Sequence, residues 1–350
     1  MEETVALEKI PQPEISQEEL LRQAQEEQRE ALRRQANEQG GVLLIYRVIM
    51  NVALFAVIFA VSFAQTFRMS FEGGFYADFS AILNTVMDSM MDTMGWGHLA
   101  AVLIGWLILR LWKKNAFFKD EIYKPGKPMG IGSFLGLVCL TFGCQLPAQL
   151  LTMGLEWVAN LFGGSIVEIL EQNAVDTDSL SMWLYVCLAA PITEEILFRG
   201  LVLRSLEPYG KKFAIIVSAV LFGLYHGNPI QTPYALLVGL ILGYVAVEYN
   251  VIWAMVLHMI NNLLLGDSLP RLLEGLPYNV ADTVMWIVLI VFFLASLVVL
   301  LIKWRTVAEK SREETVEPWQ KRAFWRSPCV VILCIMCLMD MGLILLMMFM

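Results

Sequence analysis

Long apolar runs recur along this chain and limit what it can fold into. A helix needs about 20 mostly apolar residues to cross a bilayer. Hydrophobic residues make up 57% of the sequence and charged residues only 17%, which is too apolar for a single soluble domain. We therefore expect an all-α fold, a polytopic membrane bundle of eight or nine transmembrane helices. The nine runs lie at 43–66, 97–112, 131–158, 180–204, 213–226, 233–247, 251–265, 283–302 and 329–350.

The charge balance argues against nucleic acid as a partner. The 350 residues include 25 Lys and Arg against 33 Asp and Glu, a net charge of -8, and no basic stripe is present. A protein that binds nucleic acid needs a basic face to meet the phosphates. The partners that we expect are membrane lipid and a protein or peptide.

The six cysteines all lie in apolar runs, which is typical of buried thiols and not of a secreted disulfide framework. Cys334 and Cys337 form a C-x-x-C motif, but no second pair accompanies them to complete a metal site. We expect these two side chains to serve packing.

Residues 1–41 form the one long polar segment. Ser16 followed by Glu19 is a capping-box signature, and the residues after it favour a helix. Because its apolar positions make only a weak stripe, we expect a solvated helical arm and not a partner-binding site.

Lys and Arg in the loops predict the orientation. They concentrate in segments 110–130 and 303–327, and such loops are usually cytoplasmic. With nine crossings, the N-terminus is then cytoplasmic and the C-terminus lies outside. We expect a multi-pass integral protein of the plasma membrane of a prokaryote.

Ionisable side chains inside the apolar runs cluster in three motifs. Each such group costs about 2.5–3.5 kcal/mol at a helix centre on insertion scales, so each needs a reason. They are Glu194, Glu195 and Arg199 in 180–204 (E-E-x-x-x-R), His226 at the end of 213–226 (F-x-x-x-H), and His258 and Asn262 in 251–265 (H-x-x-x-N). At 1.5 Å per helical residue from the nearest basic or turn residue, the glutamates and histidines of all three motifs lie about 12–21 Å deep, near mid-bilayer.

Helical spacing suggests how these groups pair. Glu195 and Arg199 are one turn apart and can form an ion pair, which leaves Glu194 free to face a cavity. His258 and Asn262 are also one turn apart. A carboxylate with an imidazole can activate water, and an imidazole with an amide can stabilise an oxyanion, a set that suits hydrolysis of an amide.

A structural alternative is that these groups only join helices through hydrogen bonds. Such contacts usually use Ser, Thr or Asn, and they do not call for two carboxylates, an arginine and two histidines. We therefore favour a functional site, with Glu195 and Arg199 the residues most open to a purely bracing role. Tyr225 and Asn261, beside the motifs, are expected to be packing or supporting groups.

The three motifs in this order resemble the CPBP family of intramembrane proteases, which includes type II CAAX prenyl endopeptidases and bacteriocin self-immunity proteins. The resemblance covers about residues 180–265. It implies an intramembrane endopeptidase that cleaves near a C-terminus, in a cavity open to the cytoplasmic leaflet. The implied domains are a polar arm at 1–41, accessory transmembrane helices at 42–178, a catalytic core at 179–266 and C-terminal transmembrane helices at 267–350.

By motif position, the resemblance assigns roles to the residues. Glu194 would activate water with His226, His258 and Asn262 would stabilise the oxyanion, and Glu195 and Arg199 would support the site. The family is often labelled metalloprotease, and zinc on Glu194, His226 and His258 is possible. We prefer no cofactor, because no H-E-x-x-H pair is present and the two histidines lie on different helices.

Two other functions stay open. One is a non-catalytic membrane immunity or scaffold protein that binds a peptide or partner. The other is a transporter, since intramembrane Glu and His also make proton relays, although no inverted repeat relates the two halves of the chain. Of the ionisable residues outside the motifs, His98 is expected to be structural, and Asp340 to contact a neighbouring helix or subunit.

Overall fold

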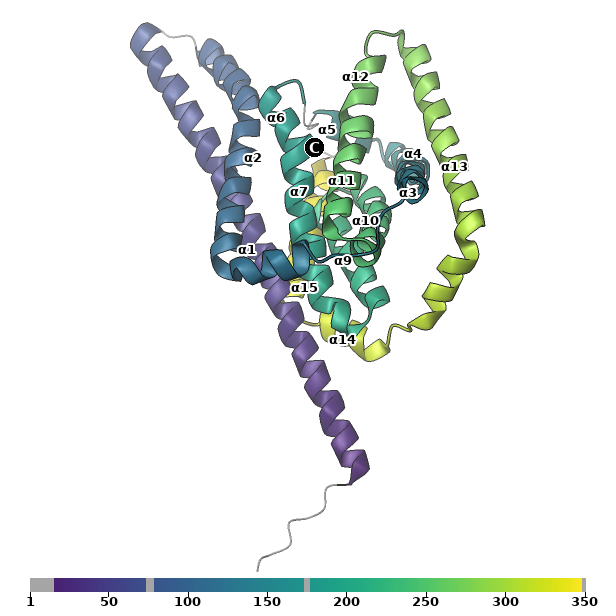
Figure 1. Cartoon of the computed structure of the whole chain (residues 1–350). Helices are drawn as coiled ribbons and strands as arrows, with labels where there is room; N and C mark the ends of the chain where they lie inside the picture. The colour runs from purple at the N-terminus through teal and green to yellow at the C-terminus, as the bar shows by residue number, and fades with distance from the viewer. Residues whose placement is uncertain (1–15, 74–78, 173–176, 348–350) are drawn as a thin grey trace, which may run out of the picture.

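The computed structural model describes residues 16–73, 79–172 and 177–347, and every regular element in these ranges is helical (Figure 1). The all-α prediction is confirmed. The first fifteen residues of the polar arm and the last three of the final apolar run lie outside these ranges. The six cysteines are free thiols.

The helices follow the apolar runs closely, although some runs contain more than one helix. The α-helices are α1 (Gln17–Gly73), α2 (Phe79–Phe117), α3 (Ile131–Gly143), α4 (Gln145–Leu161), α5 (Ile166–Gln172), α6 (Leu180–Leu184), α7 (Ala190–Glu195), α8 (Arg204–Leu206), α9 (Lys211–Tyr225), α10 (Gln231–Glu248), α11 (Val251–Asn261), α12 (Leu269–Leu273), α13 (Tyr278–Glu313), α14 (Pro318–Trp325) and α15 (Pro328–Met347). Short π-helical or 3₁₀ segments link some of them: η2 (Phe118–Ile122), η3 (Tyr185–Ala189), η4 (Ile196–Leu203), η5 (Glu207–Tyr209) and η6 (Asn262–Ser268).

Among the described residues, seven helical stretches are long and apolar enough to cross a membrane. They are Gln17–Met69, Thr93–Lys113, Ile131–Leu161, Gln231–Glu248, Val251–Leu273, Tyr278–Lys310 and Pro328–Met347. Two of the nine predicted runs are not among them. The run 180–204 carries several charges, and α9 has 15 residues, about 22 Å of helix against a hydrocarbon core of about 30 Å. The count of eight or nine spans therefore stays a prediction.

The π-helical segments lie where the polar motifs lie. Glu194 and Glu195 end α7, which lies between η3 and η4, and Asn262 begins η6. A π-helical turn shifts the backbone out of the regular hydrogen-bond pattern and is frequent at functional sites. One consequence is local: the Val186 carbonyl in η3 accepts a hydrogen bond from a side chain of another helix.

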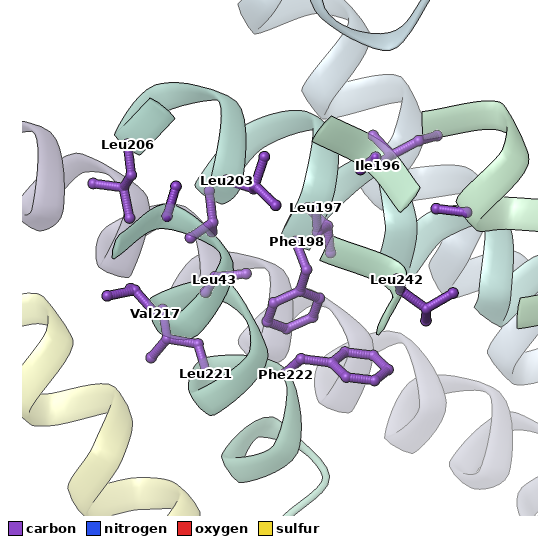
Figure 2. Close-up of a cluster of buried hydrophobic side chains, with 14 of the residues drawn as sticks. Leu43, Ile196, Leu197, Phe198, Leu203, Leu206, Val217, Leu221, Phe222 and Leu242 are labelled. Atoms are coloured by element: carbon purple, nitrogen blue, oxygen red, sulfur yellow. The ribbon is translucent and has the colours of Figure 1, made fainter. Parts of the chain in front are cut away.

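The core is formed where η4, α9 and α10 pack together (Figure 2). Phe198 and Phe222 meet edge to face at its centre, with ring centroids 5.2 Å apart. Glycine lets α9 and α10 approach closely, as the G-x-x-x-G spacing of Gly239 and Gly243 predicts. A Cβ on Gly239 would lie 3.1 Å from the Ala219 Cα, tighter than an ordinary contact.

The polar arm and the first apolar run form the single helix α1 (Figure 1). The expectation of a solvated arm is wrong for its second half, because Leu32 and Ala36 are fully buried. A Cβ on Gly40 would lie 2.8 Å from the Val330 nitrogen of α15, which shows how close the two helices come. The weak apolar stripe is therefore a packing surface against α14 and α15, whereas residues 16–30 are exposed.

Candidate active site

A buried ion pair anchors the site. Arg199 Nη1 lies 2.9 Å from Glu195 Oε1, one helical turn away, and both side chains are fully buried. Arg199 Nη2 also donates to the Gly239 carbonyl of α10 at 3.2 Å, and its guanidinium lies 4.3 Å from the centre of the Phe222 ring. The predicted pairing of Glu195 with Arg199 is present, and it also connects η4 to α9 and α10.

His258 of α11 lies between the two glutamates. Its Nδ1 is 2.9 Å from Glu195 Oε1, and its Nε2 is 3.8 Å from Glu194 Oε2. Glu195 is already paired with Arg199, so its carboxylate is the acceptor of this hydrogen bond and the Nδ1–H of His258 is the donor. The hydrogen bond fixes the ring so that Nε2 faces Glu194.

Glu194 is the carboxylate that faces open space, as the helical spacing predicts. Its side chain is 28% exposed, whereas that of Glu195 is fully buried. It borders a cavity of about 190 Å³ between η3, α7, α1 and α2. The polar side chains around it are Tyr46, Arg47, Asn51, His98, Tyr185, Thr193 and Tyr225.

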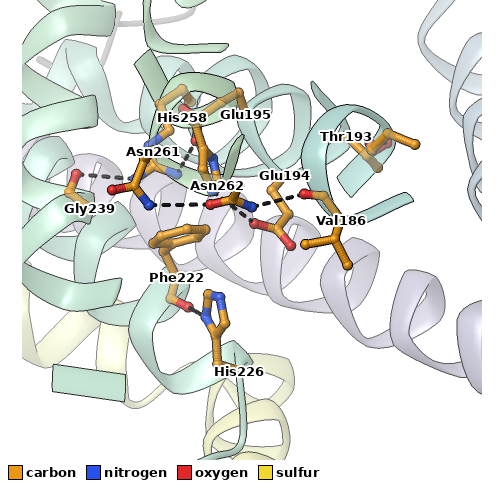
Figure 3. Close-up of polar contacts among 12 residues, drawn as sticks. Val186, Thr193, Glu194, Glu195, Phe222, His226, Gly239, His258, Asn261 and Asn262 are labelled. Carbon is orange, nitrogen blue, oxygen red and sulfur yellow. Dashed lines mark hydrogen bonds and ion pairs between the residues drawn. The ribbon is translucent and has the colours of Figure 1, made fainter. Parts of the chain in front are cut away.

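His226 lies on the other side of the Phe222 ring from His258 in Figure 3. Phe222 meets both imidazoles edge to face, at 4.9 Å from His226 and 5.6 Å from His258. The Nδ1 of His226 pairs with the Phe222 carbonyl of its own helix at 2.8 Å, which leaves Nε2 for other contacts. Within the described residues Glu194 has an ion-pair contact with His258 and none with His226.

Asn262 is held by a chain of hydrogen bonds from a second direction. Its Nδ2 donates to the Val186 carbonyl at 3.0 Å (Figure 3). Its Oδ1 accepts from Asn261 Nδ2 at 3.2 Å, and Asn261 Oδ1 accepts from the Tyr234 hydroxyl at 2.6 Å. His258 and Asn262 therefore have different partners, because the Asn262 amide is engaged with η3 and the His258 ring contacts the two glutamates.

Comparison with known proteins agrees with the motifs. Residues 176–264 match a family model described as type II CAAX prenyl endopeptidase Rce1-like. The chain contains an Rce1-like domain. This match is consistent with the CPBP family and nearly coincides with the segment 180–265 that carries the motifs. It does not extend to the bacteriocin-immunity branch. Searches of curated proteins and of solved structures found no match.

Sequence reasoning missed a group from α1 that lies beside the Rce1-like domain. Arg47 lies in the first apolar run, forms an ion pair with Asp340 of α15 and donates to the Tyr225 carbonyl at 2.8 Å. Asp340 therefore contacts a neighbouring helix, which is one of the two contacts expected from the sequence. Gly227, with φ of +61°, leaves room for the pair, since a Cβ there would lie 3.1 Å from that of Asp340. The sequence did contain a signal for this pair, namely a single arginine within the first apolar run.

Sequence reasoning also missed a hydrogen-bonded cluster around Asp267, just after the end of the Rce1-like domain. Asp267 of η6 is buried, and its carboxylate accepts from Thr177 at 2.8 Å, Trp183 at 3.1 Å and Arg271 at 2.7 Å. These bonds tie the segment before α6 to η6 and α12. None of the cavities described is lined by these residues, so we assign the cluster a structural role.

The residues of the Rce1-like domain do not fit a metal ion as they are arranged. Glu194, His226 and His258 were the possible zinc ligands. No group of three or more His, Cys, Asp or Glu side chains in the described residues is placed to hold a metal. We therefore derive no step through a metal.

Proposed function

We propose that this protein is an intramembrane endopeptidase that hydrolyses a peptide bond near the C-terminus of a protein or peptide. The Rce1-like domain supports peptidase activity at the level of the family. The observation that carries the proposal is the contrast within the glutamate pair. Glu195 is buried and paired with Arg199, whereas Glu194 faces a cavity and His258.

In the proposed reaction Glu194 takes a proton from a water molecule, and the hydroxide attacks the carbonyl carbon of the scissile bond. His226, whose Nε2 has no hydrogen-bond partner among the described residues, helps to position that water. The carbonyl oxygen becomes an oxyanion. When the tetrahedral intermediate breaks, Glu194 returns the proton to the leaving nitrogen, so that a carboxylic acid and an amine are formed.

His258 and Asn262 are proposed to stabilise the oxyanion. Glu195 accepts a hydrogen bond from the Nδ1–H of His258, so it also stabilises the protonated ring, whose Nε2–H can donate to the oxyanion. Asn262 would have to exchange the Val186 carbonyl for the oxyanion, a rotation within one side chain. Removal of one oxyanion donor typically costs about 10²–10³ in turnover.

The test is cleavage by the purified protein in lipid. Dye-labelled peptides with varied C-terminal sequences are incubated with the wild type and with Glu194→Gln, and the products are identified by mass. We expect specific cleavage by the wild type and none by Glu194→Gln. Glu309→Gln, an exposed glutamate of α13, is the matched control and should cleave normally.

The same assay distinguishes the alternatives. If the wild type binds peptides but cleaves none, the protein is a binding or immunity protein. A parallel reaction with a chelator tests the metal-free proposal, in which activity is retained. Loss of activity that Zn²⁺ restores would instead favour metal-assisted hydrolysis.

A further inference from the structure

A second cavity also borders η3, and it brings together several amide side chains. Its volume is about 440 Å³, and it lies between η3, α4, α10, η6 and α13. Its polar lining consists of Gln145, Gln149, Gln231, Tyr234, Asn261, Asn262 and Asp282. These residues come from four segments that are far apart in the sequence, so the fold and not a local motif brings them together.

Three glutamines in this cavity have no partner. The side chains of Gln145, Gln149 and Gln231 make no hydrogen bond with any described residue, although those of Asn261, Asn262 and Tyr234 are bonded to one another. Gln145 and Gln149 are one turn apart, so both lie on the same face of α4. Gln145 and Gln149 are partly buried, whereas Gln231 is exposed. A partly buried amide without a partner is unfavourable, and a polar occupant would satisfy it.

The chemistry of the lining indicates which occupant fits. A primary amide offers one carbonyl acceptor and two N–H donors, and it therefore pairs with a peptide main chain through both its N–H and its C=O groups. Among the described lining residues only Asp282 carries a charge, and it is exposed. This lining suits a neutral chain of alternating donors and acceptors, and it does not favour an anionic ligand.

The position of the cavity relates it to the candidate active site. Asn262 and Val186 line this cavity, whereas Glu194 lines the first one. His258, one turn from Asn262 on the same helical face, lies against Glu194. A chain that passes from one cavity to the other would therefore pass the three motif residues Glu194, His258 and Asn262.

We propose that the amide-lined cavity binds the main chain of an extended peptide on one side of the scissile bond. The three glutamines hydrogen-bond its N–H and C=O groups, and Asn262 stands at the boundary with the reacting carbonyl. The identification of the peptide as a substrate rests on the proposed function, but the binding site itself does not.

The test measures binding without cleavage. The dissociation constants of the dye-labelled peptides are measured on Glu194→Gln protein, with and without Gln145→Leu and Gln149→Leu. One lost hydrogen bond weakens binding about fivefold, so we expect about 25-fold for the pair. Gln65→Leu is the matched control, because Gln65 is a glutamine of the α1 span that lines none of the three cavities described.

A second measurement changes the ligand and leaves the cavity intact. Methylation of single main-chain nitrogens in the peptide removes one N–H donor at a time. At least one position should weaken binding to the parent protein and have no further effect on the double glutamine variant. If no methylated peptide binds more weakly, or if the double variant binds as tightly as the Gln65→Leu control, the proposal is wrong.

These outcomes separate the two proposals. Cleavage by the wild type with no role of the glutamines in binding would overturn the cavity assignment alone. Glutamine-dependent binding without cleavage by the wild type would overturn the peptidase and leave the binding site. If the leucine variants fail to fold, the methylated peptides still overturn the proposal when none of them binds the parent protein more weakly.

Discussion

At the scale of single residues, Glu194 and Glu195 are neighbours in sequence with opposite surroundings. Two carboxylates at one depth in a membrane repel each other, and burial penalises both charges. Arg199 and His258 contact Glu195 from two sides, whereas Glu194 is partly exposed and borders a cavity. One residue of the pair is therefore built into the structure, and the other is available for chemistry.

This difference predicts that substitution of the two glutamates has different effects on stability. Glu195→Gln leaves the buried Arg199 guanidinium without its counter-charge, and such a loss costs about 3–5 kcal/mol. We expect a lower melting temperature and lower yield, together with lost activity. Glu194→Gln should melt close to the wild type, since Glu194 is partly exposed. A folded and inactive Glu195→Gln beside an active Glu194→Gln would reverse the two roles.

Spacing along one helix was enough to predict the Glu195–Arg199 pair, because residues four apart always share a face. The contact of His258 with Glu195 could not be predicted in this way. It depends on how α11 is rotated against α7, and the packing of the whole bundle sets that rotation. The same applies to Asn262, whose partner is a carbonyl that the π-helical geometry of η3 presents.

At the scale of helices, the length of the apolar runs predicted where most helices lie. It did not predict where a run is divided into two helices. The run 131–158 reads as one long helix, yet it forms α3 and α4, which meet at Cys144. Pro147 in the first turn of α4 has no N–H to donate to the preceding turn, which explains the break. The π-helical segments have no comparable signal in the sequence.

The close approach of α9 and α10 gives a prediction at this scale. Gly239→Val places a branched side chain about 3 Å from the backbone of α9 and disturbs the carbonyl that Arg199 uses, so the bundle must open. We expect a clearly lower melting temperature and loss of activity. Gly154→Val is the control, since nothing lies within 4 Å of a Cβ there. Equal melting temperatures for the two variants would show that the helices separate without cost.

At the scale of the whole molecule, basic segments from distant parts of the chain meet at one end of the bundle. Lys127 and Lys310 both contact the carboxylate of Glu248, at 2.7 and 2.6 Å. The hydrogen bond from Lys127 to Glu248, with the charge of that carboxylate, raises the pKa of Lys127. The two segments that the sequence analysis assigned to the cytoplasm therefore lie on one side of the membrane.

The sequence also predicts which side of the membrane that is. The excess of Lys and Arg predicts that the N-terminus, segment 110–130 and segment 303–327 are cytoplasmic. A single cysteine at position 119, in a variant without the six native cysteines, should resist an impermeant thiol reagent in intact cells and react after the membrane is opened. Full labelling in intact cells would show that the orientation is the reverse of the predicted one.

The Arg47–Asp340 pair also bears on how the chain is made. Its two members are 293 residues apart, so at about 5–20 residues per second Arg47 is synthesised about 15–60 s before Asp340. Through that interval the guanidinium of α1 has no counter-charge from α15, and a charge in that state is unfavourable within the membrane. The pair can form only after α15 has been synthesised. A chain truncated before α15 therefore keeps Arg47 in the membrane without this counter-charge.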